Sequence, residues 1–253
     1  MPNILDTERY RFAYAQSVVT PLVLWESHCH ARFELIAVLE GDISIMMEGK
    51  NYRLVNHQAM IIPPLCYHTI TVNKQGRYHR VTALFDVSAI PVPLQTHFSD
   101  ATDVAVFSPS CMEELKGICM KQDSAFYAPL AESLMMKTFY EYLETKQSDT
   151  AMETDEFLQQ AISYIDKHLC EKITLDDLAA VTTRSKSSFC HVFEEKMKIS
   201  PKQYIVQKKL AFADKMIREG VPPTVAAFRI GYENYSNFYR MYLKQYGVSP
   251  RKH

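Results

Sequence analysis

The chain has 253 residues, of which 47% are hydrophobic, and its formal net charge at pH 7 is −1. This length and apolar content are those of a folded protein with room for two domains, and they exclude a disordered chain. The longest uninterrupted apolar run, Leu35 to Leu39, is too short to cross a bilayer, and the first residues show no secretory signal. The six cysteines form no Cys-x-x-Cys pair, so we expect free thiols and a cytoplasmic protein without membrane contact.

Charge is distributed unevenly along the chain. From Lys172 to the last residue there are 15 Lys and Arg against 7 Asp and Glu, a surplus of +8, and the remainder holds 13 against 22, or −9. A basic part behind an acidic part is typical of a nucleic-acid module joined to a domain that stays off DNA. The simpler alternative is an ordinary solvated surface with unevenly placed charges.

The first 108 residues show the pattern of β-structure. A hairpin turn is expected at Glu48–Asn51. The runs that predict strands are Glu34–Leu39, Asp42–Glu48, Tyr52–Val55, Ala59–Ile62, Thr69–Val72 and Val81–Val87. Many short strands at this spacing favour a barrel or sandwich, so we predict an all-β domain over residues 1–108.

From Pro109 onward the hydrophobic period is helical. A first helix is marked by Leu115, Ile118 and Cys119. A second, longer helix carries a wide stripe made of Leu130, Leu134, Met135, Thr138, Phe139, Tyr142 and Leu143. Such a stripe suits packing on the β-domain and on a second subunit, so residues 109–146 are predicted as a dimerisation or transmission segment, with simple packing as the alternative. The small, polar stretch 147–154 is the predicted linker.

Residues 155–253 predict an all-α domain. An amphipathic helix is expected over Asp155–Cys170, and Thr174 with Asp177 has the spacing of a helix cap. Ser200-Pro201-Lys202-Gln203 is a strong start signal for a helix that ends at Gly220. Its 19 residues would rise about 28 Å at 1.5 Å each. Successive major grooves on one face of DNA lie about 34 Å apart, so this helix has roughly the reach that two-groove binding requires.

Two segments on either side of this long helix share one pattern. Each predicts a short helix, a tight turn and a second helix that begins near a serine, Ser185 or Ser236. The second helices place aromatic pairs on their buried faces: Phe189 with Phe193, and Phe238 with Tyr242. This arrangement is the helix-turn-helix, whose second helix enters the major groove of DNA.

The outward positions of these two second helices are the candidates for DNA contact. They are Lys186, Ser187, Ser188, Cys190 and His191 in the first, and Asn234, Tyr235, Asn237, Arg240 and Lys244 in the second. Asn237 and Arg240 suit base edges, because asparagine pairs with adenine and arginine with guanine. Lys244, Arg184 and Lys209 are expected at phosphates, which position the protein without specifying sequence.

A group of four residues in the β-region has the chemistry of a ligand site. His28, His30 and Glu34 have the spacing His-x-His-x3-Glu, and strand alternation allows them to converge with His68 inside a barrel. Three imidazoles and a carboxylate suit a divalent transition metal such as Zn, Fe, Mn or Ni. The alternatives are a structural cluster and the lining of a pocket for a small organic effector, which we favour. Tyr67, Arg32, Trp25 and Arg80 are the candidates for its aromatic or cationic wall.

The C-terminal hundred residues resemble the AraC/XylS family of bacterial transcription regulators. The most specific string is GYENYSNFYRMYLKQYGVSP at residues 231–250, whereas Lys198 stands where the family usually has glycine. The spacing His-x-His-x3-Glu-x6-Gly, which ends at Gly41, resembles the cupin barrel that such regulators commonly carry, although His57 and Leu65 replace glycines usual in metal cupins.

The resemblance implies a cupin-like barrel followed by helices and a DNA-binding domain with two helix-turn-helix motifs. It implies a ligand-responsive regulator, not an enzyme, that binds promoter DNA in two adjacent major grooves. The expected partners are a small-molecule effector, a second copy of the chain and, for an activator, RNA polymerase. The alternative is a metal-dependent cupin enzyme, such as a dioxygenase or isomerase, with a helical appendage.

Overall fold

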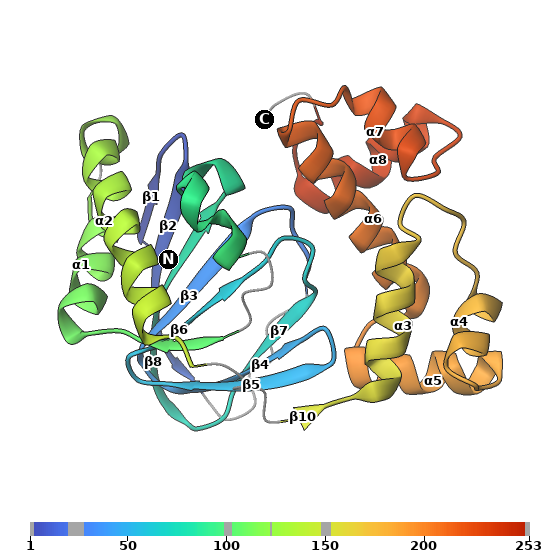
Figure 1. Cartoon of the computed structure of the whole chain (residues 1–253), viewed down its shortest axis with the longest axis horizontal. Coiled ribbons are helices and arrows are strands. Elements are labelled where there is room, and N and C mark those ends of the chain that lie inside the picture. Colours follow the sequence, from blue (N-terminus) through green and yellow to red (C-terminus); the bar gives the residue numbers. More distant parts are fainter. Residues whose placement is uncertain (1–2, 20–27, 99–102, 122, 148–152, 251–253) are drawn as a thin grey trace.

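The computed structural model describes residues 3–19, 28–98, 103–121, 123–147 and 153–250. Figure 1 shows a β-structure flanked by two groups of helices, one from the middle of the chain and one from its C-terminal part. The predicted fold class, an all-β part followed by helices and an all-α C-terminal part, is confirmed. Among the described residues, no helix has both the length and the apolar character to cross a membrane.

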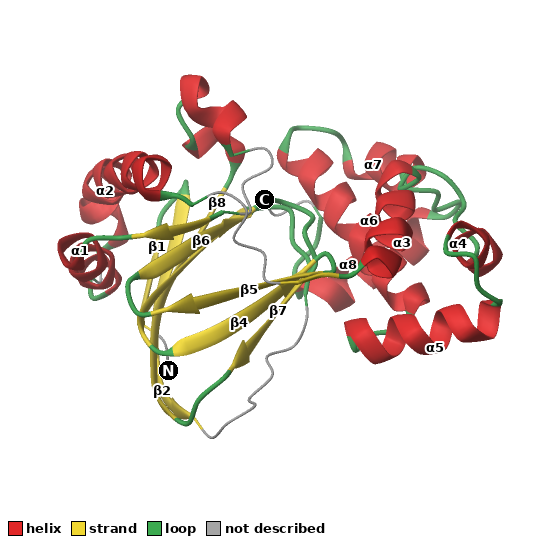
Figure 2. Cartoon of the chain, turned by 60° about the horizontal axis from the view of Figure 1, so that its bottom comes forward, coloured by secondary structure: helices red, strands yellow, loops and turns green. Residues whose placement is uncertain are grey.

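Ten strands form two antiparallel sheets that face each other as layers (Figure 2). They are β1 (Asn3–Asp6), β2 (Tyr10–Val19), β3 (Phe33–Glu40), β4 (Asp42–Met47), β5 (Lys50–Val55), β6 (Gln58–Ile62), β7 (His68–Val72), β8 (Gly76–Phe85), β9 (Val104–Val106) and β10 (Glu153–Thr154). One sheet has the order β1-β2-β8-β3-β6-β9 and the other β10-β5-β4-β7. Two short 3-10 helices, Val87–Ala89 and Val92–His97, follow β8.

Strand β3 is buried on both faces, which explains its unbroken apolar sequence. Leu35 and Ala37 belong to the core under the helices that follow the sheet, whereas Ile36 and Val38 face the second sheet. The space between the sheets is filled by large side chains that are at most 7% exposed, including Ile43, Tyr52, Met60, Ile70 and Tyr78. A ligand of this β-domain is therefore expected at an end of the sheets and not in their middle.

The six predicted strands are confirmed, with small differences at their ends. The hairpin between β4 and β5 is tighter than predicted, because Glu48 (φ 50°) and Gly49 (φ 77°) alone form the turn and β5 begins at Lys50. Strand β8 ends at Phe85, and Asp86 is the residue before the following 3-10 helix, whose first turn is closed by Ala89 N donating to the Asp86 carbonyl oxygen. Strands β1, β2, β9 and β10 were not predicted, although the buried Tyr10, Phe12 and Tyr14 alternate along β2.

Eight α-helices follow: α1 (Pro109–Cys119), α2 (Ser124–Thr145), α3 (Glu156–Lys167), α4 (Leu175–Val181), α5 (Lys186–Met197), α6 (Pro201–Arg218), α7 (Pro223–Arg229) and α8 (Tyr235–Tyr246). Helices α1 and α2 cover the outer face of the six-stranded sheet. The predicted stripe on α2 is buried at Leu134, Met135, Phe139 and Tyr142, whereas Leu130 is 51% exposed and does not pack on the sheet.

The predicted linker contains ordered structure at both ends. Glu153 and Thr154 form β10, which pairs with Asn51 and Lys50 of β5, and Gln147 forms a bridge to Val104. Residues 148–152 lie outside the described part of the chain. Strand β10 was not predicted because a strand of two residues depends on the strand with which it pairs and not on its own sequence.

A buried acidic residue stabilises the end of the hairpin sheet. The Asp42 carboxylate accepts hydrogen bonds from Arg53 Nε (2.9 Å), Arg53 Nη2 (2.7 Å) and Asn73 Nδ2 (2.9 Å), and Lys74 Nζ lies 3.2 Å away. The bonds from Arg53, with smaller contributions from Asn73 and Lys74, hold the pKa of Asp42 well below its usual range.

We expect Asp42→Asn to lower the free energy of unfolding at pH 7 by about 1–3 kcal/mol, because charge-assisted hydrogen bonds are lost. A depressed pKa in the folded state contributes stability above the unfolded value of about 3.9, and this contribution disappears as the pH falls. The difference between the two proteins should therefore shrink below about pH 4 in urea titrations. The matched control is Asp6→Asn, since Asp6 is exposed and its only described ion pair, to Arg11, is 4.0 Å long. A difference that stays constant with pH would contradict the assignment.

Candidate nucleic-acid interface and metal centre

Helices α4 and α5 form the first helix-turn-helix unit. Thr174 and Asp177 make the predicted capping box at the start of α4, and the Ser185 side chain accepts from Ser188 N (3.3 Å) at the start of α5. Phe189 and Phe193 are fully buried, and the Phe193 ring lies 5.3 Å from that of Tyr204 on α6. The opposite face of α5 is thereby directed outward.

Helices α7 and α8 form the second unit. Gly231 (φ 87°) supplies the left-handed residue in the turn, and Phe238 and Tyr242 are fully buried. The helix begins at Tyr235, near Ser236 as predicted, and its N-cap is Asn234, whose side chain accepts from Ser236 N at 2.8 Å. Part of the hydrogen-bonding capacity of Asn234 is thus used within the turn.

Helix α6 connects the two units. The predicted capping box of Ser200 and Gln203 is present, and the 18 residues give a length of about 27 Å. Lys198, before this helix, is left-handed (φ 56°), the conformation that the usual glycine would adopt without strain. Lys209, which was predicted to contact phosphate, is directed to backbone carbonyl oxygens within the domain. The Lys209 ammonium donates to the carbonyl oxygens of Glu171 (2.6 Å) and Ile230 (2.9 Å), which come before and after α6 in the sequence.

All ten predicted DNA-contacting residues lie outside the cores, but to different degrees. Those that are exposed are Lys186, Ser187, His191, Asn234, Asn237, Arg240 and Lys244, and those that are half-buried are Ser188, Cys190 and Tyr235. Cys190 packs against the first core, and the Tyr235 ring lies 5.8 Å from that of Phe238. These two residues therefore have a packing role, which weakens their candidacy for the groove.

Asn237 and Arg240 are presented together. Arg240 Nη2 donates to Asn237 Oδ1 at 2.5 Å, and both side chains are exposed one turn apart on α8. On the first unit, Lys186 Nζ pairs with Asp176 at 2.9 Å, and the Arg184 guanidinium lies 5.0 Å above the Phe157 ring. The pair on α8 has the donors and acceptors that purine edges in the major groove require.

The four ligand candidates of the β-domain converge at one end of the sheets. Glu34 Oε2 lies 2.9 Å from His30 Nε2, 3.2 Å from His68 Nε2 and 3.9 Å from His28 Nε2. One ligand atom from each residue lies within 4.8 Å of all the others. His68 and Glu34 are buried, whereas His28 is exposed. Burial raises the pKa of Glu34, but hydrogen bonds to His30 and His68 outweigh it and hold that pKa well below its usual range.

The second nitrogen of two rings is fixed by the backbone. His30 Nδ1 lies 2.8 Å from the Arg32 carbonyl oxygen, and His68 Nδ1 lies 3.0 Å from that of Cys66. A carbonyl only accepts, so each Nδ1 carries a proton, and in a neutral ring Nε2 is then an acceptor that faces the Glu34 carboxylate. Acceptors at this separation require a shared cation, either a proton on the ring or a metal ion between them.

The other predicted pocket residues lie elsewhere. Tyr67 is 1% exposed and packs on Tyr204, and Arg32 Nε lies 3.5 Å from Asp86 Oδ2. The Arg80 guanidinium lies 5.1 Å from the centre of the Tyr78 ring, and Trp25 lies outside the described residues. The Tyr67 and Arg32 side chains therefore have partners outside the four-residue cluster, and an effector pocket lined by them stays a prediction. The compact arrangement of the four residues fits the metal alternative better. His57 and Leu65, at positions of usual glycines, have positive φ values of 66° and 68°.

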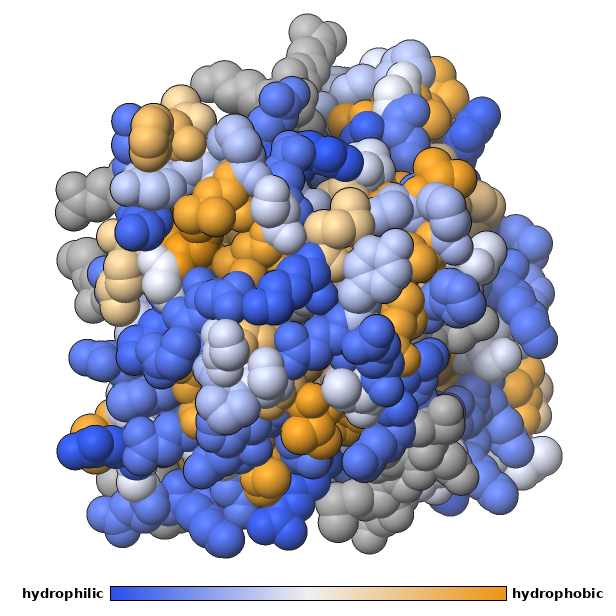
Figure 3. Space-filling view, turned by 60° about the vertical axis from the view of Figure 1, so that its left-hand side comes forward, coloured by the Kyte–Doolittle hydropathy of each residue, from blue (hydrophilic) through white to orange (hydrophobic). Residues whose placement is uncertain are grey.

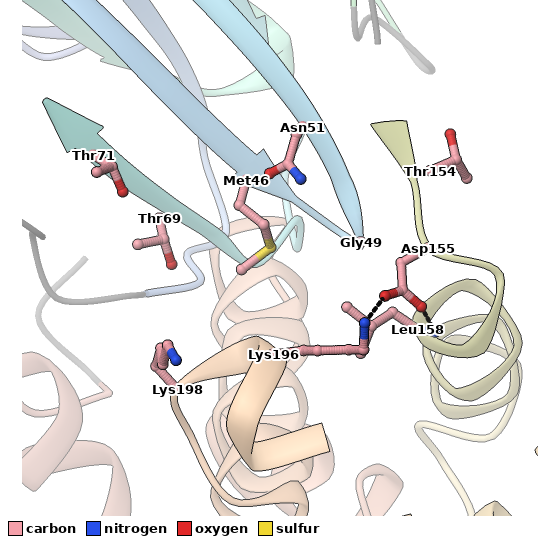
Figure 4. Close-up of a pocket in the computed structure, with 10 residues that line it drawn as sticks. All are labelled: Met46, Gly49, Asn51, Thr69, Thr71, Thr154, Asp155, Leu158, Lys196 and Lys198. Carbon is pink, nitrogen blue, oxygen red and sulfur yellow. Dashed lines mark hydrogen bonds and ion pairs between the residues drawn. The ribbon is translucent and has the colours of Figure 1, made fainter. Parts of the chain in front are cut away.

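A cavity of about 570 Å³ between the β-domain and the first helical unit was not predicted (Figure 4). Its lining residues are Met46, Gly49, Asn51, Thr69, Thr71, Thr154, Asp155, Leu158, Lys196 and Lys198. Lys196 Nζ pairs with Asp155 at 2.5 Å. The cavity is formed by segments that are more than 80 residues apart in sequence, so local sequence patterns carried no signal for it. Its ammonium and hydroxyl groups suit an anionic group.

Comparison with known proteins identifies the C-terminal part of the chain. The family model described as "Helix-turn-helix domain" matches residues 178–253. The chain is 26% identical over 229 residues to the uncharacterized HTH-type transcriptional regulator YobQ of Bacillus subtilis (strain 168), covering 90% of this chain and 88% of that protein. It is 32% identical over 92 residues to the probable transcriptional regulator LumQ of Photobacterium leiognathi, covering 36% and 37%. A structure of ToxT from Vibrio cholerae aligns over 96% of this chain and 94% of ToxT, with 8% identity and a TM-score of 0.45.

These matches and the geometry of α4–α8 define a DNA-binding transcription regulator with a helix-turn-helix domain. The matches agree with the resemblance to AraC/XylS regulators for the helix-turn-helix domain, which in this chain follows a β-domain.

Proposed function

We propose that this regulator binds two successive major grooves of one duplex through α5 and α8, and that a divalent transition metal ion at His28, His30, Glu34 and His68 controls its DNA affinity. The observation that supports two-groove binding is the attachment of both reading helices to one capped helix, α6, with the polar faces of both exposed. Its length of about 27 Å is close to the groove spacing of about 34 Å, and the turns at its two ends extend it.

The donor set of the β-domain fits such an ion. Three imidazole nitrogens and one ionised carboxylate are a ligand set for Zn²⁺, Fe²⁺, Mn²⁺ or Ni²⁺. Two of the rings are oriented by carbonyl oxygens, as is usual for metal-binding histidines. A bound ion would supply the cation that the facing acceptors require. The four residues would hold the ion and would thereby connect the segment that carries His28, His30 and Glu34 to the segment that carries His68.

The experiment that tests the function is binding of purified protein to a library of promoter fragments, with zinc chloride or with a chelator present. We expect one enriched sequence and a difference in affinity between the two conditions. Absence of any sequence preference above the nonspecific level would contradict the proposal. Metal binding and substrate turnover without sequence preference would support the rival function, a metal-dependent enzyme of the β-domain.

We expect Arg240→Ala to cost about 1–3 kcal/mol of binding free energy and to relax specificity at one base position. The exposed guanidinium beside Asn237 is placed to read guanine, so its loss should affect the preferred sequence more than other sequences. The matched comparison is Lys244→Ala, a change on the same helix that should weaken binding equally for all sequences. Fluorescence anisotropy on a set of single-base variants measures both. Uniform weakening by Arg240→Ala would contradict base reading.

We further propose that the outer face of α1 and α2 binds a second copy of the chain. Apolar side chains are exposed on α2, notably Phe126 (73%), Leu130 (51%) and Tyr140 (51%). A groove of about 390 Å³ between the two helices is lined by Ile118, Leu130 and Leu134, with Glu114, Lys121 and Lys137 at its edges. Figure 3 shows this side of the molecule, where apolar side chains lie among polar ones. Residues of both charges beside an apolar stripe favour a self-complementary contact between identical chains.

We expect Leu130→Glu to convert a dimer to a monomer in analytical ultracentrifugation, because a carboxylate would be buried without a partner at the contact. Val18→Glu is the control, since Val18 is 83% exposed on β2. Sedimentation of the unchanged protein as a monomer at micromolar concentration would contradict the contact. An unchanged dimer in the Leu130 variant would place the contact on another surface.

A further inference from the structure

The two segments that carry the histidines lie side by side at the boundary with the DNA-binding part. His28 N donates to His68 O (3.2 Å), His68 N donates to His28 O (3.1 Å), and Leu65 N donates to His30 O (2.9 Å). Because neighbouring side chains in extended chain point to opposite sides, the histidines face the ligand cluster and their neighbours face away from it. Those neighbours are Cys29 and Tyr67, which are 2% and 1% exposed.

Cys29 and Tyr67 are buried in the core of the first helix-turn-helix unit. They belong to the same apolar cluster as Phe189, Phe193 and Tyr204, and the rings of Tyr67 and Tyr204 are 4.9 Å apart. The same short pieces of backbone thus hold metal-ligand candidates on one side and α6 on the other. A displacement of either segment on one side is transmitted to the other, since close-packed cores do not absorb it.

A buried charge reinforces this contact. Lys208 of α6 donates to Glu48 Oε1 (2.9 Å), to Asp166 Oδ1 (2.8 Å) and to the Leu65 carbonyl oxygen (2.7 Å), and its side chain is 2% exposed. Glu48 also accepts from Tyr67 N (2.5 Å) and from the Tyr204 hydroxyl (3.0 Å). Burial lowers the pKa of Lys208, but Glu48 and Asp166 outweigh it and raise that pKa, so the ammonium stays charged.

A second contact lies at the C-terminal end of α6, whereas Lys208 lies near its middle. The Arg32 carbonyl oxygen accepts from the His30 ring, and the Arg32 side chain lies 3.5 Å from Asp86. Asp86 Oδ2 lies 3.9 Å from Arg218 Nη1, and Arg218 Nε donates to Asp214 at 2.9 Å. Asp214 accepts from the Tyr242 hydroxyl of α8. Lys208 and Arg218 are ten residues apart, or about 15 Å along the helix.

We propose that occupancy of the histidine cluster is transmitted to both reading helices through these two contacts on α6, at Lys208 and at Arg218. The inference rests on the proposed function and names its route. A metal ion held by His28, His30, Glu34 and His68 would fix the two segments relative to each other. It thereby stabilises the docked position of α6 over any position in which the segments separate. The two ends of α6 carry the two reading units, so docking sets their geometry on DNA.

The test measures a thermodynamic cycle with zinc alone as the metal. DNA affinity is measured with zinc and with chelator, and zinc affinity is measured with and without DNA. The two ratios must be equal, and we expect a coupling of about 5- to 150-fold in the unchanged protein. Lys208→Met should bring the coupling close to 1, while zinc affinity of the free protein stays within a few-fold, because Lys208 is not a ligand.

Lys215→Met is the matched control. It removes one positive charge from α6, but its described ion pair is to Glu219 on the same helix, at 4.0 Å. This variant should retain the coupling of the unchanged protein. Arg218→Met and Glu48→Gln test the route independently where Lys208→Met does not fold, and each should reduce the coupling. Thermal unfolding of each variant identifies those that are folded.

Unchanged coupling in folded Lys208→Met and Arg218→Met proteins overturns the route and leaves the proposed function intact. Absence of zinc binding or of coupling in the unchanged protein overturns the proposed function itself. Loss of coupling in both variants, with coupling retained in Lys215→Met, supports the route.

Discussion

Insertion of five base pairs between the two halves of a recognised operator is expected to weaken binding about 30-fold or more. Five base pairs rotate the second half-site by about half a turn of B-DNA, which moves it to the opposite face of the duplex. Helix α6 is continuous from Pro201 to Arg218 and is capped at its start by Ser200 and Gln203, so the second unit cannot follow. Binding then loses the base contacts of one helix, each worth about 1–3 kcal/mol.

An insertion of ten base pairs distinguishes a rigid connection from a flexible one. This insertion returns both half-sites to the same face of the duplex. It also separates them by about a further 34 Å, which is more than α6 spans. We therefore expect both insertions to weaken binding to a similar extent in electrophoretic titrations. Recovery of affinity with the ten-base-pair insertion would show that α6 does not hold the two units at a fixed separation. If neither insertion weakened DNA binding, two-groove binding by one chain would be contradicted.

Replacing His68 by alanine is expected to lower zinc affinity by about 100-fold or more, since loss of a direct ligand exceeds the roughly 10- to 100-fold loss typical of an outer partner. His68 is fully buried, and its Nε2 is 3.2 Å from the Glu34 carboxylate. Isothermal titration or competition with a chromogenic chelator gives the affinity. The matched control is His79→Ala, because the His79 ring pairs with Glu40, 3.5 Å away, and lies outside the cluster. Equal zinc affinity of the two variants would contradict the assignment of the centre.

Local signals predicted the C-terminal part well. Ser185 and Ser200 cap α5 and α6, and a capping box starts both α4 and α6, because caps depend on residues only three positions apart. The exception was Asn234. The cap at the start of α8 was not predicted, and it is supplied by Asn234, whose side chain accepts from Ser236 N.

In the β-domain the four predicted ligand residues lie together, whereas the Tyr67 and Arg32 side chains have partners outside this cluster. The four ligand candidates do converge. Alternation should have placed Tyr67 on the face opposite to His68, because successive side chains in a strand point to opposite sides. Arg32 shares the parity of His30 and Glu34 but lies in a bend before β3, where the alternation is interrupted. Neither Glu48 nor Lys208 carried a local signal, since their contact joins residues that are 160 positions apart.

The ammonium of Lys209 couples the stability of the two halves of the DNA-binding part, which two separate motifs would not show. It joins the carbonyl oxygens of Glu171 and Ile230, and Phe212 packs against the apolar clusters of both units. Unfolding of one half therefore removes hydrogen-bond acceptors and packing contacts from the other half. The two halves are for this reason expected to unfold as a single cooperative unit. Evolution of a new operator preference must then proceed by changes on the outer faces, because a change in either interior destabilises both halves at once.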